Sequence, residues 1–275
     1  MKVPYTMPGK VYLVGAGPGS AKLLTLQALE LLQTVDVVLH DDLVSDEVLA
    51  RVSPRVAVHN VGKRCGEKKV TQEEINRRMI LTARAGLCVV RLKSGDPLIF
   101  GRTQEEIQAL REAGIPFEIV PGITAASAAA AQAQIPLTER RTASKLIFVS
   151  NHPGTEKMRR TWHESVTKDA TLAFYMPGSE FSALLEELRT RRVSEDTPCL
   201  LVSRVSHENQ KMLKTTVRHL PNITQAAAPA LSLLIIGEAV AEAQGCEELQ
   251  TVVTEKGRRE EILLLDADRE QIPAD

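Results

Sequence analysis

The sequence lacks the features of membrane, secreted and nucleic-acid-binding proteins. No apolar run reaches the roughly 18 residues of a membrane span, and the N-terminal MKVPYTMPGK has no apolar segment of the kind that secretory leaders carry. The 34 basic and 35 acidic residues leave a net charge of −1, so no overall field attracts nucleic acid or an anionic membrane. We therefore expect a cytoplasmic protein that binds neither, and in which local basic patches meet any acidic ligand.

Cysteine and histidine are few and lack the spacings of disulfide or metal sites. The four cysteines contain no CxxC pair, which favours reduced thiols over a disulfide framework or a zinc site. The six histidines form neither HxH nor HExxH, so no metal site is predicted. Gly62-Lys63-Arg64 is not a P-loop, because the upstream glycine spacing and a following Ser or Thr are missing. The serines form no nucleophile elbow.

Short strands and amphipathic helices alternate through the first half of the chain. Apolar, β-branched runs predict strands over 10–15, 35–40, 87–92 and 116–120. Helical spacing of apolar residues predicts helices over 23–34, 71–85, 103–113 and 124–133. Thr71 followed by Glu74 is the capping-box pattern that opens the second of these helices. The alternation predicts parallel strands with helices on both faces of a sheet, which is an α/β domain.

A second alternating region indicates a second domain. The 275 residues exceed the roughly 100–150 residues that are commonest for one domain. The polar stretch 135–144 predicts the junction. Beyond it we expect strands near 145–150, 171–175, 198–203 and 231–236, and helices near 155–166 and 181–191. The predicted organisation is an N-terminal α/β domain over 1–138, a C-terminal α/β domain over 139–245, and a charged, flexible tail over 246–275.

A glycine-rich loop, Gly15-Ala16-Gly17-Pro18-Gly19, joins the first predicted strand to the first helix. Glycines at such a place let the backbone turn sharply and approach a ligand, beside the unpaired N–H groups of a helix N-terminus. The loop departs from the dinucleotide-binding GxGxxG pattern, because Ser20 occupies the sixth position and Pro18 stiffens the turn. Alone, the loop fits either a ligand site or a purely structural turn.

Three more loops follow predicted strands, namely 40–45 (HDDLVS), 61–69 (VGKRCGEKK) and 91–102 (RLKSGDPLIFGR). In open α/β sheets ligands collect outside the carboxyl ends of the strands, so these loops and the glycine loop are expected to share one crevice. Asp41 and Asp42 would face it. Its positive walls would come from Lys63, Arg64, Lys68, Lys69, Arg91, Lys93 and Arg102. Taken singly, each of these charges is more often a solvated surface residue.

Taken in order, the segments resemble the uroporphyrinogen-III C-methyltransferases of the tetrapyrrole methylase family. The resemblance covers about residues 9–240. The segments that carry it are VGAGPG (14–19), LLTL (23–26), VVLHDDLVS (37–45), VGKR (61–64), QEEIN (72–76), VVRLKSGDPLIFGR (89–102), GIPFEIVPGITAAS (114–127), IPLTERR (135–141), FYM (174–176) and PALSLLIIGEAV (229–240). The resemblance implies two α/β domains with the active-site cleft between them, and a homodimer.

The implied reaction moves two methyl groups from S-adenosylmethionine to C2 and C7 of uroporphyrinogen III, giving precorrin-2 for sirohaem or corrinoid synthesis. By the family's pattern, Asp41 is the candidate base for the proton that leaves the macrocycle. Lys63 is a candidate for proton transfer or for holding a substrate carboxylate, and basic loops suit a substrate rich in carboxylates. The positions that match the family's cofactor site are Pro18, Ser94, Gly95, Asp96, Ile99, Thr124, Ala125, Met176, Val205 and Ala230.

The sequence departs from the family's usual pattern in both expected binding regions. Ser20 stands where an acidic residue is usual, Glu139-Arg140-Arg141 replaces a His-Arg-Asp triplet, and Ser203-Arg204-Val205-Ser206 replaces an acidic or amide-containing segment. Ser94 stands where a glycine is usual. We expect Ser94 to keep an ordinary backbone conformation, because Gly95 beside it can take any unusual torsion.

Two other functions fit parts of the sequence. A nucleotide-dependent oxidoreductase would use the glycine loop as a dinucleotide site. A divergent binding or regulatory protein would keep the fold without the chemistry. Stabilisation by S-adenosylhomocysteine, and not by NAD or NADP, separates the methyltransferase from the first alternative, and turnover separates it from the second.

Overall fold

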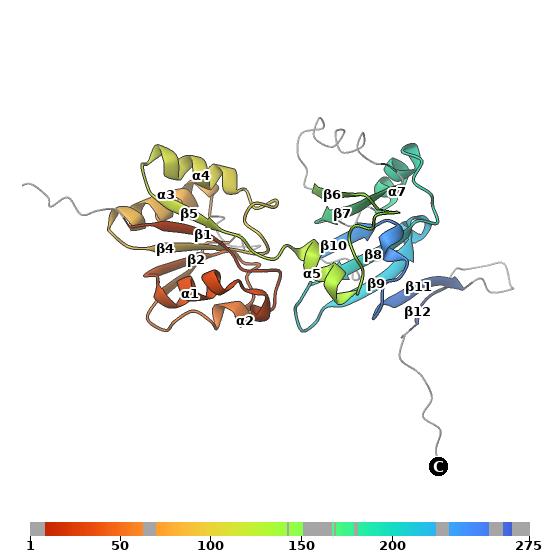
Figure 1. The fold of residues 1–275 in the computed structure, drawn as a ribbon, viewed down its shortest axis with the longest axis horizontal. Coiled ribbons are helices and arrows are strands. Elements are labelled where there is room, and N and C mark those ends of the chain that lie inside the picture. Colours follow the sequence, from red (N-terminus) through yellow and green to blue (C-terminus); the bar gives the residue numbers. More distant parts are fainter. Residues whose placement is uncertain are drawn as a thin grey trace, which may run out of the picture. The chain divides into compact units, whose positions relative to one another are not determined.

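The computed structural model describes residues 9–62, 70–141, 143–150, 167, 169–178, 181–223, 231–252 and 261–265. The chain divides into two compact units, Met1–Ala125 and Ala126–Asp275, and each has its own sheet (Figure 1). None of the helices in the described part of the chain is long and apolar enough to cross a membrane. The helix predicted over 155–166 lies outside the described residues.

The first unit is built on a five-stranded sheet of order β3-β2-β4-β1-β5. All of its pairings are parallel, as predicted from the alternation of strands and helices. The strands are β1 (Val11–Gly15), β2 (Val37–His40), β3 (Ala57–Asn60), β4 (Val89–Lys93) and β5 (Phe117–Val120). The helices are α1 (Leu26–Thr34), α2 (Asp46–Leu49), α3 (Gln72–Arg84) and α4 (Thr103–Glu112), with a 3₁₀ turn η1 (Ala21–Leu23).

Alternate side chains of these strands enter two separate cores. Leu13 of β1 packs in a cluster with Met79 of α3 and Leu110 of α4. Its neighbour Val14 packs in a second cluster with Leu32 of α1 and with residues of α2. Figure 1 shows α3 and α4 on one face of the sheet and α1 and α2 on the other. The sheet is therefore apolar on both faces, which explains why its strands read as continuous apolar runs.

Side-chain caps set the starts of the helices in this unit. The hydroxyl of Thr71 accepts a hydrogen bond from the backbone N–H of Glu74 at 3.2 Å, which confirms the predicted cap of α3. Thr25 and Ser45 cap α1 and α2 in the same way. Such caps satisfy backbone donors that the first helical turn leaves unpaired.

The second unit contains a mixed seven-stranded sheet of order β12-β11-β9-β8-β10-β7-β6. The strands are β6 (Lys145–Ser150), β7 (Ala170–Tyr175), β8 (Pro198–Ser203), β9 (Lys211–Thr216), β10 (Ser232–Ile236), β11 (Glu247–Val252) and β12 (Glu261–Leu265). Helices α5 (Ala125–Gln132) and α7 (Phe181–Thr190) and the 3₁₀ turns η3 (Val217–Asn222) and η4 (Glu238–Val240) complete the described elements. β6 and β7 are parallel, whereas β10 is antiparallel to both β7 and β8.

Three strands of this sheet were not predicted. β9 (KMLKTT) pairs antiparallel with β8, although its sequence is polar at every second position or more. β11 and β12 pair with each other within the range predicted to be a charged tail. These strands form because partner strands supply their backbone hydrogen bonds. Such pairing cannot be predicted from a local polar sequence.

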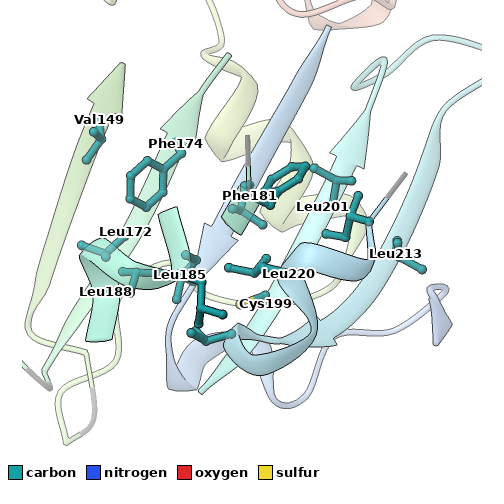
Figure 2. Packing of buried hydrophobic residues seen from close by; sticks show 14 of the residues in the cluster. Val149, Leu172, Phe174, Phe181, Leu185, Leu188, Cys199, Leu201, Leu213 and Leu220 are labelled. Carbon is teal, nitrogen blue, oxygen red and sulfur yellow. The ribbon is translucent and has the colours of Figure 1, made fainter. Parts of the chain in front are cut away.

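Apolar side chains from α7 and η3 form the core on one face of the second sheet (Figure 2). Phe181 and Leu188 of α7 and Leu220 of η3 are buried against Leu172 of β7 and Leu201 of β8. Because these side chains interdigitate from four elements, truncating the largest of them would leave a cavity.

Helix α5 packs with the second unit. The backbone N–H of Ala126 donates to the hydroxyl of Tyr175 at 3.3 Å, and that of Gln244 donates to the carbonyl of Ala133 at 3.0 Å. The contacts therefore divide the chain after Ala125, the first residue of α5, whereas the sequence placed the boundary beyond this helix, between residues 138 and 139. The polar stretch used for that prediction follows the helix and includes a small hairpin contact between Glu139 and Ala143.

Candidate functional site

Loops of the first unit meet backbone to backbone at the carboxyl edge of its sheet. Gly17 and Gly95 exchange N–H···O bonds of 3.2 and 2.8 Å. A Cβ added at Gly15 would lie 2.6 Å from the Cα of Gly122, and one added at Gly122 would lie 2.2 Å from the carbonyl oxygen of Gly95. We name Gly15, Gly17, Gly95 and Gly122 the glycine junction. Packing alone requires glycine at Gly15 and Gly122, so the glycine loop has a structural role whether or not it meets a ligand.

One part of the glycine junction is open. Gly95 has φ +69°, and a Cβ added there would meet no atom within 4 Å. Ser94 is not among the described residues with positive φ, so Gly95 takes the unusual torsion, as expected. A ligand can therefore approach the backbone at Gly95 without displacing a side chain.

Asp96 ties the loop after β4 to the loop after β5. Its Oδ2 accepts from the backbone N–H of Gly122 at 3.0 Å, and its Oδ1 accepts from that of Leu98 at 2.8 Å. A carboxylate oxygen has room for a second donor. A role for Asp96 toward a ribose or an ammonium group stays a prediction.

The remaining cofactor positions predicted in this unit follow the ends of β1, β4 and β5. Pro18 is buried beside Gly17, and Ile99 and Thr124 are half-buried. Ala125, also half-buried, begins α5. The carboxyl edge of one sheet thus gathers all the predicted cofactor positions of the first unit.

Met176 and Val205 lie at one edge of the second sheet, just after β7 and β8. The backbone N–H of Met176 donates to the carbonyl of Ser232 at 3.3 Å, and that of Arg204 donates to Leu231 at 2.8 Å. Val205 is buried, whereas Met176 is 40% exposed. The tenth predicted cofactor position, Ala230, lies outside the described residues.

Backbone torsions of an unusual kind concentrate near these two edges. Positive φ angles occur at seven of the described non-glycine residues, and five of the seven lie in the loop after β4 or in the turns after β7 and β8: Phe100, Arg102, Met176, Arg204 and Ser206. Such torsions are costly for residues with a Cβ, and they persist where the surroundings demand them, often at functional sites.

Asp41, the candidate base, follows β2 and is held by a buried ion network that comprises Asp41, Arg91, Lys93 and Glu106. The Asp41 side chain is 30% exposed, and its Oδ1 accepts from Nη2 of Arg91. Nε of Arg91 donates to Oε1 of Glu106 at 3.0 Å. Nζ of Lys93 donates to Oε2 of Glu106 at 2.8 Å. One buried carboxylate from α4 thus pairs with two cations from β4.

Burial and pairing act in opposite directions on the two cations. Burial lowers the pKa of Lys93, and the attraction of Glu106 only partly offsets this. Burial also acts to lower the pKa of Arg91, but the nearby charges of Asp41 and Glu106 outweigh it and raise that pKa. Arg91 therefore stays a cation inside the unit.

Arg91 and Lys93 were predicted to line the crevice as positive walls, and this is wrong. Their neighbours Val90 and Leu92 pack in the cluster with α1 and α2, so residues 91 and 93 turn to the opposite face and meet Glu106. Both are buried. Arg102, in contrast, is exposed and pairs with Glu105 at 2.7 Å.

Glu106 was not predicted as a site residue, although the sequence contains a signal for it. The buried residues of α4 are Thr103, Glu106, Ile107 and Leu110, which are spaced like the apolar stripe of an amphipathic helix. A glutamate on such a stripe needs a buried cation as partner, and the neighbouring strand supplies two.

Lys63 and the rest of 63–69 lie outside the described residues. Asp42 accepts a hydrogen bond from Nδ2 of Asn60 at 2.7 Å. Ser20 caps η1 and donates to Glu47 at 3.3 Å, so this departure from the family's pattern has a local structural role. Among the described residues, no group of His, Cys, Asp and Glu could hold a metal ion.

Comparisons with known proteins agree with this geometry. Residues 10–221 match the family of tetrapyrrole (corrin/porphyrin) methylases. Siroheme synthase 1 of Klebsiella pneumoniae subsp. pneumoniae is 43% identical over 237 residues, which are 86% of this chain and 50% of that protein. The chain therefore spans about half the length of the curated relatives it matches.

Solved structures share the fold. The uroporphyrin-III C-methyl transferase of Thermus thermophilus, complexed with S-adenyl homocysteine, has a TM-score of 0.71 and 36% identity, with 85% of this chain and 99% of that chain covered. A cobalt precorrin-4 methyltransferase of cobalamin biosynthesis has a TM-score of 0.75 and 31% identity, with 84% and 95% covered. Two enzymes named for different tetrapyrroles are thus similar to this chain, so the fold alone does not fix the substrate.

Proposed function

Because the chain belongs to the tetrapyrrole methylase family, we propose that it catalyses S-adenosylmethionine-dependent methylation of uroporphyrinogen III at C2 and C7, giving precorrin-2 for sirohaem or corrinoid synthesis. One observation carries the proposal: a candidate base, Asp41, and an open glycine junction lie at the carboxyl edge of the same sheet, within the matched residues. We further propose that the protein works in the cytoplasm as a homodimer.

The open backbone at Gly95 suits the cofactor. Pro18, Ser94, Gly95, Asp96, Ile99, Thr124 and Ala125 of the first unit would hold it, together with Met176, Val205 and Ala230 of the second. Backbone groups at Gly95 are accessible because a Cβ there would meet nothing within 4 Å. The half-buried Ile99 and the partly exposed Met176 would add apolar contacts. When bound, S-adenosylmethionine supplies an electrophilic methyl group.

Asp41 would accept the proton that the methylated macrocycle must lose. Methylation of a pyrrole carbon leaves positive charge on the ring, and a carboxylate nearby both stabilises this charge and removes the proton. Arg91 binds Oδ1 of Asp41, so Oδ2 is the oxygen assigned to the proton. A fixed carboxylate avoids the cost of orienting it during the reaction.

Exposed apolar and basic groups near the same edge suit a macrocycle with carboxylate arms. Leu98, Phe100 and Ile123 are exposed although they are large and apolar, and flat rings pack on such side chains. Arg102, two residues after Phe100, is exposed and can pair with a carboxylate.

Lys63 would act on substrate, so Lys63→Ala should slow methylation and leave the affinity for S-adenosylhomocysteine nearly unchanged. Equal loss of both would remove Lys63 from the substrate site.

Formation of S-adenosylhomocysteine that depends on uroporphyrinogen III tests the proposal. We expect release when both compounds are present under anaerobic conditions, and none when the tetrapyrrole is omitted. Thermal stabilisation by S-adenosylhomocysteine, without stabilisation by NAD or NADP, is expected in parallel. Stabilisation by a dinucleotide alone would instead support the oxidoreductase. Cofactor binding without turnover would support a regulatory protein.

A further inference from the structure

Glu106 is the fully buried carboxylate at the centre of the ion network. Its side chain has no exposed surface, and it accepts from Arg91, Lys93 and, at 3.3 Å, from Nε2 of Gln72 on α3. Burying ions is costly before they pair, and apolar residues of similar volume often replace such groups without loss of stability. A buried ion network is therefore weak evidence for a stabilising role, and its geometry beside Asp41 suggests a role in the site.

The network fixes the guanidinium of Arg91 in one orientation. Its Nη1 donates to the carbonyls of Leu39 at 3.4 Å and Leu92 at 3.2 Å, its Nε donates to Glu106, and its Nη2 donates to Asp41. A planar guanidinium held at three nitrogens cannot rotate. The position of Oδ1 of Asp41 therefore follows from the position of Glu106 on α4.

We propose that Glu106 is a positioning residue for Asp41 and acts through Arg91. The inference rests on the proposed function, because it assigns Asp41 the proton of the methylated ring. In that step a C–H bond of the methylene bridge beside the methylated pyrrole breaks, its electron pair forms a C=C bond to the pyrrole and neutralises the positive charge, and the proton goes to Oδ2 of Asp41. Arg91 keeps Oδ1 in place, and Glu106 keeps Arg91 in place. Glu106 also pairs with Lys93, the last residue of β4 before the loop of Ser94 and Gly95.

Glu106→Gln tests the proposal, with Glu112→Gln as the matched control. Glutamine keeps the size of the side chain, but its NH₂ group must face Arg91 or Lys93, which are both donors. Glu112 lies on the same helix and is exposed. We expect Glu106→Gln to lower kcat at least about tenfold while the KM for S-adenosylmethionine changes little. Glu112→Gln should leave both unchanged.

A double-mutant cycle separates positioning from a general structural effect. If Glu106 acts through Asp41, Glu106→Gln should lower the residual kcat of Asp41→Asn by no more than about twofold. The same fold-loss in both backgrounds would overturn the proposal, as would a wild-type kcat in Glu106→Gln. If Glu106→Gln does not fold, Glu106→Asp takes its place in the cycle, since it keeps the charge but is too short to reach both cations.

A crystal structure of Glu106→Asp distinguishes failure of this inference from failure of the proposed function. If the wild-type protein does not methylate uroporphyrinogen III, the proposed function fails and this structure decides the positioning role. We expect the guanidinium of Arg91 and the carboxylate of Asp41 to be displaced. Both groups found in their original places would overturn the proposal whatever reaction the protein catalyses.

Discussion

The two units of the molecule differ in the polar side chains that they bury. Within the described residues, the buried Arg, Lys and Glu side chains all belong to the first unit: Arg91, Lys93 and Glu106. The ion pairs of the second unit, such as Arg218 with Asp196, lie at its surface, and the polar residues in its interior are neutral, namely Thr171, Ser203, Ser206, Thr215 and Ser232.

This difference suggests that the two units have different roles in the proposed reaction. Both units bury an apolar core, and buried charges are not a general requirement of such cores. The first unit keeps them next to Asp41, where the proposed reaction needs an oriented carboxylate. The second unit contributes strained turns at Met176, Arg204 and Ser206, together with apolar surface. We therefore place the acid–base chemistry in the first unit and a supporting role in cofactor binding in the second.

The largest effect expected from this division is at Asp41. Asp41→Asn should lower kcat by about 10²–10⁴-fold, because an amide cannot accept the proton, while the affinity for S-adenosylhomocysteine stays nearly constant. Initial rates and isothermal titration of the same preparation measure both quantities. Near-normal turnover would remove Asp41 from the mechanism. It would also remove the reason for assigning the acid–base chemistry to the first unit.

A smaller effect is expected at the glycine junction. Gly122→Ala would force a Cβ to within 2.2 Å of the carbonyl oxygen of Gly95, and overpacking of this kind costs about 1–3 kcal/mol. Because the backbone at Gly95 must shift, binding of S-adenosylhomocysteine should weaken by more than about tenfold. Titration calorimetry and urea unfolding measure the two effects.

Gly114→Ala is the control for this prediction. Gly114 has φ +66°, and a Cβ there would meet no atom within 4 Å, so alanine adds only backbone strain of about 1–2 kcal/mol. The unfolding free energy should fall while the affinity for S-adenosylhomocysteine is retained. Equal loss of affinity in both variants would mean that instability, not the shape of the junction, controls binding.

A third prediction sharpens the role of the second unit. Met176→Gly should relieve the strain of φ 52° at this residue and raise the unfolding free energy by up to about 1 kcal/mol. The same change removes the apolar side chain and should weaken S-adenosylhomocysteine binding severalfold. Arg192→Gly, at φ 59°, should gain similar stability without loss of affinity. If Met176→Gly binds as well as the wild type, Met176 is not a cofactor residue.

The smallest effect is expected at Ser94. Since Gly95 carries the positive φ, restoring glycine at 94 relieves no strain. Ser94→Gly should change the affinity for S-adenosylhomocysteine by less than about tenfold, which is roughly 1.4 kcal/mol. A much larger gain in titration calorimetry would show that serine strains the site.

The sequence predicted the fold of the first unit better than its charges. Apolar periodicity and the cap at Thr71 located α1, α3, α4 and four of the five parallel strands, because burial on both faces of a sheet produces a clear pattern. The short helix α2 and the edge strand β3, whose residues are all exposed, were not predicted. The same pattern does not say which face a charged residue takes. Arg91 and Lys93 were therefore placed in the crevice, although they point to α4 and pair with Glu106.

The second unit was harder to predict because its pairing is non-local and mixed. The sequence of β9 is largely polar, and it forms a strand because it pairs with β8. The candidate site residues were assigned from the family resemblance that the ordered motifs carry, and not from the chemical properties of the individual residues. Asp41 and Asp96 carry no signal of their own, whereas Glu106 on an apolar helical stripe did.

The mass of the tetrapyrrole product tests the central claim most directly. The wild-type protein would be incubated anaerobically with enzymatically made uroporphyrinogen III and an excess of S-adenosylmethionine, and the products identified by mass spectrometry. We predict a product with two added methyl groups, formed by the wild-type protein and nearly absent with Asp41→Asn. A product with no added methyl group, from protein that binds S-adenosylhomocysteine, would contradict the proposed methylation.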